Sequence, residues 1–251
     1  RSRTVASLAG EASQLVEAGA RELILVAQDT TTYGRDLTPR SDLVELLTAL
    51  DGQGGGLRWI RLLYAYPTRV DQELVGAMAR LPRVVPYLDL PVQHVDDVVL
   101  RRMKRGYDGE RVARALDTVR AGLPGVALRT TLICGHPGET DHAHQRLLAF
   151  LEQARLDHVG AFPFSAEDGT DAAEQPDQVP AAVAQERVDA VMALQRRISS
   201  EKLHALVGQE LEVLVDGPDP ESEFLMVGRH PGQAPEIDGV VHLADCGAGA
   251  G

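Results

Sequence analysis

Hydrophobic and polar residues along the chain alternate between two spacings. Short apolar runs, each long enough for a buried strand, lie at 23–27, 60–64, 84–90, 126–133 and 158–162. Apolar residues at helical spacing lie around them, which predicts helices at 8–16, 41–50, 70–79, 96–104, 108–121 and 140–154. Strand and helix alternate about five times with short connections. This order predicts an α/β fold with a parallel sheet, as either a barrel or a doubly wound sheet.

The pattern changes after about residue 165. Residues 167–180 are polar and acidic and contain prolines, which favours a loop, and 181–207 is typical of one long helix. Beyond Gly208 two short β-type runs, 211–215 and 240–243, indicate part of a small β-barrel. We therefore expect two domains, 1–207 and 208–251.

Composition narrows the function classes. The net charge is −12 over 251 residues, which disfavours general nucleic-acid binding and suits a basic partner. No apolar run is long enough for a membrane span. The two cysteines, Cys134 and Cys246, are far apart, which excludes a disulfide framework and a CxxC-type metal site. The sequence opens at Arg1 without a methionine, and we interpret it as a fragment.

Polar residues and glycines follow several of the predicted strands, where parallel α/β folds place their sites. In QDTTTYG, Gln28 and Asp29 offer groups that accept an ammonium, and an ordinary Asx turn is the alternative. In TLICGHPGET, Gly135 permits the close approach of a planar ligand, and a plain strand–turn–helix corner is the alternative.

Charged residues also lie within two predicted strands. Asp89 in YLDLPVQH is expected to be buried and therefore to need a partner. Arg129, placed inside a parallel strand, must face a carboxylate or a ligand. Gln93 and His94 emerge where the Asp89 strand ends, and a lone histidine there is more often a structural hydrogen-bonding group than a catalyst.

Taken in order, these segments resemble one family. QDTTTYGRDL, RLLYAYP, PYLDLPVQH, LRRMKRGYD, RTTLICGHPGET, VGAFPFSAEDGTDA and APEIDG are similar to the RimO-type ribosomal-protein methylthiotransferases of the radical S-adenosylmethionine (SAM) superfamily. The resemblance covers nearly the whole chain, to about residue 243.

The resemblance implies a partial (β/α) radical SAM barrel followed by a TRAM-like β-barrel. It also implies a cytoplasmic transferase that uses SAM and two [4Fe–4S] clusters. Such enzymes add a methylthio group to the β-carbon of an aspartate in the twelfth small-subunit ribosomal protein, which is a basic partner, and they need an electron donor. By the same resemblance the SAM-binding residues are Gln28, Asp29, Gln93, Arg129, Ile133, Gly135 and Phe162.

The chain departs from the family in its metal ligands. The CxxxCxxC loop of the family would precede Arg1, so metal ligands are absent and we expect this chain alone to be inactive. Two alternatives stay open: a tRNA methylthiotransferase of the MiaB branch, and a non-catalytic binding fragment. The region from Gly208 carries nine acidic residues against Arg229 alone, which makes tRNA the less favoured partner.

Overall fold

The computed structural model describes residues 1–247 and 249. A five-stranded parallel sheet in the order β1-β2-β3-β4-β5 forms its larger part. The strands are β1 (Glu22–Leu25), β2 (Trp59–Leu62), β3 (Val84–Asp89), β4 (Ala127–Cys134) and β5 (His158–Pro163). The strand order follows the chain order, which is the arrangement of a barrel wall rather than of a doubly wound sheet.

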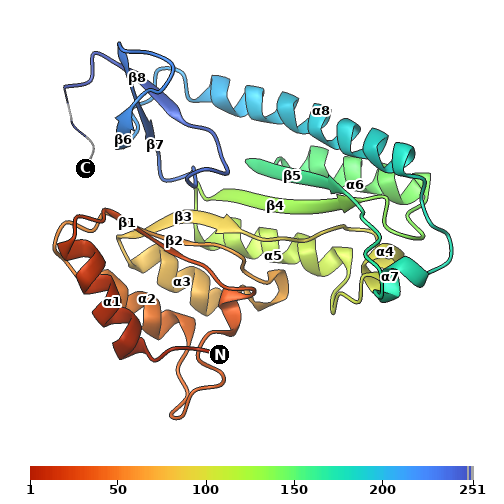
Figure 1. The fold of residues 1–251 in the computed structure, drawn as a ribbon, viewed down its shortest axis with the longest axis horizontal. Helices are drawn as coiled ribbons and strands as arrows, with labels where there is room; N and C mark the ends of the chain where they lie inside the picture. The colour runs from red at the N-terminus through yellow and green to blue at the C-terminus, as the bar shows by residue number, and fades with distance from the viewer. Residues whose placement is uncertain (248, 250–251) are drawn as a thin grey trace.

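Helices cover one face of this sheet. Figure 1 shows α1, α2, α3 and α5 along one side, and α6 and α8 beyond β4 and β5. The larger helices are α1 (Val5–Glu17), α2 (Leu43–Asp51), α3 (Gln72–Arg80), α5 (Gly109–Gly122), α6 (Asp141–Ala154) and α8 (Ala181–Ala205). Short elements join them: η1 (Thr30–Thr32), η2 (Pro67–Arg69), α4 (Asp97–Arg102) and α7 (Asp171–Glu174).

Local sequence explains where the helices begin. An Asp or Thr side chain accepts a backbone N–H of the first turn at the start of α1 to α6, which stabilises each helix end. These caps are Thr4, Asp42, Asp71, Asp96, Asp108 and Thr140. Apolar faces such as Leu46, Leu47 and Leu50 of α2 then pack on the sheet. Within the described part of the chain, no helix combines the length and the apolar character needed to cross a membrane.

A small antiparallel sheet follows α8. It contains β6 (Leu214–Pro218), β7 (Leu225–Arg229) and β8 (Val241–Ala244) in the order β6-β7-β8. Figure 1 shows this sheet at the end of the molecule opposite α7, so it lies toward the amino ends of the large sheet's strands.

The predicted parallel α/β barrel wall and the predicted small β region after it are both confirmed. Three details differ from the prediction. The strand β7 was missed, the expected strand at 211–215 is shifted to Leu214–Pro218, and the expected loop at 167–180 contains the short helix α7. The second helix begins after Asp42, whose side chain accepts the N–H of Glu45.

Candidate functional site at the carboxyl ends of the strands

The inner face of the large sheet, opposite the helices, is covered at one end and open at the other. Side chains that alternate along the strands point inward, and at the amino end Trp59, Tyr87 and Ala127 pack with Ala234 of the second domain. Toward the carboxyl ends the apolar side chains are exposed: Val26 is 64%, Tyr64 43% and Phe162 56% exposed. Exposed apolar groups at this edge are what a ligand with an apolar surface would cover.

Three of the predicted residues meet at this open end. Ile133 of β4 lies in register with Phe162 of β5. Gln93 extends the sheet beside β4: its N–H donates to the Thr131 carbonyl and its own carbonyl accepts from the N–H of Ile133. The φ of Gln93 is +67°, a strained conformation for a residue other than glycine. Gln93, Ile133 and Phe162 therefore lie on three adjacent backbone segments at this end of the sheet.

Gly135 has a different reason to be glycine from the one suggested by the sequence. Its φ is +83°, and a Cβ there would lie 2.3 Å from the Cβ of Ala184 on α8. Helix α8 thus occupies the space that a Cβ of residue 135 would need. The plain strand–turn–helix corner accounts for this glycine.

A buried carboxylate, Glu139, holds that corner together. Its Oε2 accepts the N–H of Gly135, and Arg187 of α8 lies 3.4 Å from the same oxygen. Its Oε1 is 3.5 Å from both His94 Nε2 and His144 Nδ1. Because His94 Nδ1 accepts the N–H of Asp96, the proton of a neutral His94 is on Nε2 and points to Glu139.

The pKa of Glu139 reflects these contacts. Burial raises the pKa of this carboxyl group, but the His144 and His94 rings facing Oε1 and the hydrogen bond from the Gly135 N–H outweigh it and lower the pKa to about 2. Glu139 is therefore ionised at neutral pH. Its carboxylate connects His94 after β3, Gly135 after β4 and Arg187 of α8.

Gln28 and Asp29 lie at the carboxyl end of β1, three strands away from β4. Asp29 Oδ1 accepts the N–H of Thr31 at 3.0 Å, which is the Asx turn considered as the alternative. Its Oδ2 is paired with Arg69. Gln28 is exposed. A ligand ammonium at this end would compete with Arg69 for the carboxylate.

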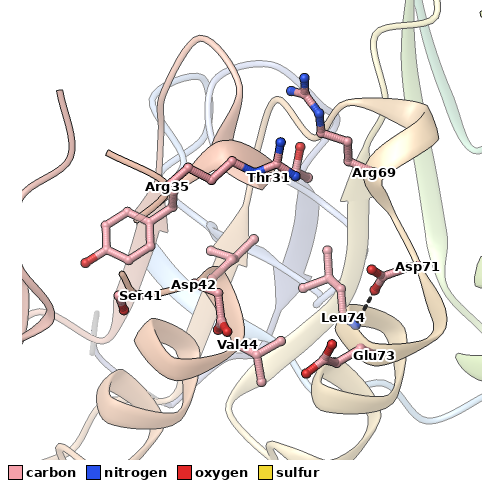
Figure 2. A pocket seen from close by; sticks show the side chains of 11 residues that line it. Thr31, Arg35, Ser41, Asp42, Val44, Arg69, Asp71, Glu73 and Leu74 are labelled. Carbon is pink, nitrogen blue, oxygen red and sulfur yellow. Dashed lines mark hydrogen bonds between the residues drawn. The ribbon is translucent and has the colours of Figure 1, made fainter. Parts of the chain in front are cut away.

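Outside the sheet, a hollow of about 150 Å³ adjoins this loop (Figure 2). Arg35 and Arg69 lie on one side of it, and the first turns of α2 and α3 lie on the other, with Asp71 capping Leu74. Pockets for small-molecule ligands are typically about 300–1,000 Å³. This hollow is too small to be the main site.

Arg129 lies deeper than the other predicted residues. It is the third residue of β4, its side chain is 14% exposed, and its Nη1 is 3.3 Å from Asp89 Oδ1 and from Thr131 Oγ1. Asp89 was expected to need a partner and Arg129 to face a carboxylate or a ligand, and in the structure the two face each other. Burial raises the pKa of Asp89 even though Arg129 opposes this effect. Arg129 Nε also lies 3.5 Å from Asp238 Oδ1 of the second domain.

A second group of buried charges lies at the amino end of the inner face. Arg61 is fully buried and pairs with Glu22 at 2.7 Å, while its Nη1 donates to the Pro231 carbonyl at 2.8 Å. Arg229 pairs with the same Glu22 and, at 2.8 Å, with Asp216. These contacts fasten the small sheet to β1 and β2.

Sequence reasoning missed this group as well as Tyr87, His158 and Asp238. A signal was present for Arg61, because it is a charged residue inside an apolar strand, as Arg129 is. No local signal marks Asp238, whose partners lie far away in the sequence.

The described residues can be compared with the two expected cofactors, an iron–sulfur cluster and SAM. Cys134 is fully buried, and burial raises the pKa of its thiol to about 12, while Cys246 lies in the second domain. Among residues 1–247 and 249 no group of three or more His, Cys, Asp or Glu is arranged to hold a metal. These residues do not fit an iron–sulfur cluster. The neighbouring apolar residues Ile133 and Phe162 at the open end, with the Phe162 ring exposed, are compatible with the nucleoside part of SAM.

Comparison with protein families gives two matches. Residues 1–151 match the Radical SAM superfamily and residues 207–250 match the TRAM domain. The second match begins one residue before the boundary expected from the sequence.

Curated relatives match almost the whole chain. "Ribosomal protein uS12 methylthiotransferase RimO" of Anaeromyxobacter sp. (strain K) is 49% identical over 98% of this chain and 52% of its own length. The proteins of that name from Myxococcus xanthus and Syntrophobacter fumaroxidans are 47% and 49% identical, over 51% and 54% of their lengths. The chain spans about half the length of the curated relatives it matches.

Solved structures support the fold. Coproporphyrinogen III oxidase (HemN) from Escherichia coli, described as a radical SAM enzyme, matches with a TM-score of 0.55 and 14% identity, over 77% of this chain and 46% of its own. Methylornithine synthase matches with a TM-score of 0.52 and 16% identity, over 78% and 53%. At such identities the likeness concerns the fold alone.

Proposed function

This chain belongs to the radical SAM superfamily, and from that premise we propose that it is part of a methylthiotransferase acting on ribosomal protein uS12. The observation that carries the proposal is the 45–49% identity over almost the whole chain to relatives named for that activity. Family membership implies SAM and iron–sulfur chemistry. That there are two [4Fe–4S] clusters, held by sequence that this chain lacks, belongs to the proposal.

In the proposed reaction, a methylthio group is added to the β-carbon of an aspartate of uS12 in the cytoplasm. The C–H bond at that carbon is not acidic enough for a general base, and the SAM-derived radical supplies the required reactivity when the cofactors are bound, with electrons from a donor protein. The residues of this chain bind and orient SAM. We assign the nucleoside end of SAM to Gln93, Ile133 and Phe162, with Arg129 below them, Gly135 shaping the corner and Gln28 and Asp29 at the methionine end.

Charge on the second domain supports a basic protein partner. Of its nine acidic residues, seven are exposed: Glu210, Glu212, Asp216, Glu221, Glu223, Glu236 and Asp245. Its one arginine, Arg229, is buried between Glu22 and Asp216. A surface of this kind repels a nucleic-acid backbone and attracts a basic ribosomal protein.

The decisive experiment compares uS12 and tRNA by mass spectrometry in cells with and without the gene. We expect uS12 to lose one methylthio group and tRNA to keep its modifications. Loss of a tRNA methylthio group alone would place the protein in the tRNA branch, and no change in either would favour a binding role.

Complementation with variants connects that result to the site. Phe162→Ala removes the exposed ring at the open end, and we expect it to restore less than about a tenth of the uS12 modification. Leu203→Ala is the matched control, since Leu203 is 57% exposed on α8, away from the strand ends, and should restore the modification fully. Equal restoration by both variants would count against the assigned site.

A further inference from the structure

The second domain contributes one carboxylate, Asp238, to the inner face of the large sheet. The side chain of Asp238 is 1% exposed. Its Oδ2 accepts the hydroxyl of Tyr87 at 2.7 Å and the N–H of Ala234 at 2.9 Å. Its Oδ1 faces a side chain of β4 and a side chain of β5, with Arg129 Nε at 3.5 Å and His158 Nδ1 at 3.3 Å. The carboxylate is therefore fixed on one side by hydrogen bonds and directed on the other at β4 and β5.

Arg129 lies on the inner face between the amino end, which the second domain covers, and the open carboxyl end. Its Nε, on the inner side, is buried and lacks a hydrogen bond within the described chain, so Asp238 Oδ1 is the anion that compensates it. Its Nη1 points to Asp89 and Thr131. Its Nη2 lies beside Gly160, 3.7 Å from where a Cβ would be, and the ring of Phe162 borders the same glycine at 3.5 Å. The Nε of the guanidinium thus faces Asp238 on the covered side, and its Nη2 lies near Phe162 on the open side.

His158 of β5 makes two further contacts with the second domain. Its Nε2 lies 2.8 Å from the Gly232 carbonyl, an oxygen that only accepts, and its Nδ1 faces the Asp238 carboxylate. The turn at 230–238 of the second domain therefore contacts three residues of the large sheet. Its Asp238 contacts Tyr87 and Arg129, and its Gly232 carbonyl contacts His158.

We infer that Asp238 is a positioning residue: from the second domain it holds the Arg129 guanidinium in the orientation that meets SAM. The inference rests on the proposed function, in which Arg129 contacts the cofactor. It makes the docked second domain a part of the cofactor site. By thermodynamic linkage, SAM binding and docking of the 230–238 turn then stabilise each other.

The test measures SAM affinity of the chain by equilibrium dialysis with labelled SAM. Asp238→Asn keeps the size of the side chain and removes its charge, and we expect SAM affinity to fall about tenfold. Asp219→Asn is the matched control, because Asp219 is a buried carboxylate of the same domain that pairs with His242 and not with Arg129; its affinity should stay within about twofold. In an Arg129→Met background, Asp238→Asn should have no further effect on affinity, which a merely structural role would not predict.

The outcomes separate the inference from its premise. Equal affinity for SAM in the unsubstituted chain and in Asp238→Asn overturns the inference alone, as does an unchanged effect of Asp238→Asn in the Arg129→Met background. Absence of SAM binding to the unsubstituted chain contradicts the proposed cofactor contact and takes the inference with it.

A measurement without substitutions covers the case in which Asp238→Asn does not fold. In protein labelled with ¹⁵N-arginine, the Nε–H of Arg129 should exchange slowly with water and shift when SAM is added. A rapidly exchanging signal that SAM leaves unchanged would overturn the inference.

Discussion

Gly135 and Cys134, neighbours at the end of β4, are both constrained by what packs against them. Gly135 has a positive φ and lies against Ala184, and the Cys134 side chain is fully buried on the helical side of the sheet. Neither residue needs a ligand to explain it. This distinguishes them from Ile133 and Phe162, whose side chains face the open inner side.

Gly135→Ala should lower the free energy of unfolding by about 3 kcal/mol, because it adds overpacking against Ala184 to the strain of a positive φ. Gly125→Ala is the control: its φ is +78° and nothing lies within 4 Å of an added Cβ, so the loss should be about 1 kcal/mol. Urea unfolding monitored by circular dichroism measures both values, and equal losses would contradict the packing explanation.

Cys134 should resist alkylation in the folded protein. Burial raises the pKa of its thiol to about 12, so the reactive thiolate is scarce at about pH 8. We expect iodoacetamide to modify Cys134 only after unfolding in urea, as read by mass spectrometry of the peptide that contains it. Rapid labelling of the folded chain at this residue would show that β4 opens on the time scale of the reaction.

At the scale of secondary-structure elements, the corner between β4 and α6 depends on Glu139. Its carboxylate connects this corner to His94 after β3 and to Arg187 of α8. Because the pKa of Glu139 is lowered in the folded state, its ionised form stabilises the fold above the unfolded-state value of about 4.5, and this contribution is lost as the pH falls toward about 2.

Acid titration tests this role of Glu139. Between about pH 4.5 and pH 2 the unsubstituted chain should lose roughly 3 kcal/mol of unfolding free energy from this group, and Glu139→Gln should lack that part of the pH dependence. Exposed Glu110, whose side chain is 76% exposed in its pair with Arg114, supplies the control Glu110→Gln. A Glu139→Gln profile that runs parallel to the unsubstituted one would refute the assignment.

Elements with a strong repeating pattern were predictable from the sequence, and those formed by distant contacts were not. The five parallel strands and their helices have apolar runs or helical spacing, and their positions differ from the prediction by a few residues at most. The strand β7 has no alternation, and its pairing with β6 and β8 defines it. For the site, the strand ends were predicted, whereas Tyr87 and Asp238 meet across a sequence separation of 151 residues.

At the scale of the whole molecule, two groups of buried charges connect the domains: Arg61, Arg229 and Glu22 at the amino ends of the strands, and Arg129 with Asp238 further along. Removal of one partner from a buried pair leaves an uncompensated charge, which is more costly than loss of an exposed pair. Docking of the second domain is thus tied to the stability of the first.

Arg229→Met should lower the unfolding free energy by about 3–5 kcal/mol and separate one unfolding transition into two. Arg197→Met is the control, since Arg197 also contacts two carboxylates but is 49% exposed on α8, and its loss should cost at most about 1 kcal/mol. Differential scanning calorimetry distinguishes these results. A single unshifted transition in Arg229→Met would show that the buried pairs do not couple the domains.

The bond from Arg229 to Glu22 joins residues 207 positions apart in the sequence. During synthesis Glu22 therefore emerges long before Arg229, and it lacks this partner until Arg229 has followed. Until the turn at 230–238 has left the ribosome exit tunnel, Trp59, Tyr87 and Arg61 lack their cover. Nascent chains stalled before that turn should therefore be recognised by chaperones, and emergence of the turn should allow the small sheet to dock in one late step.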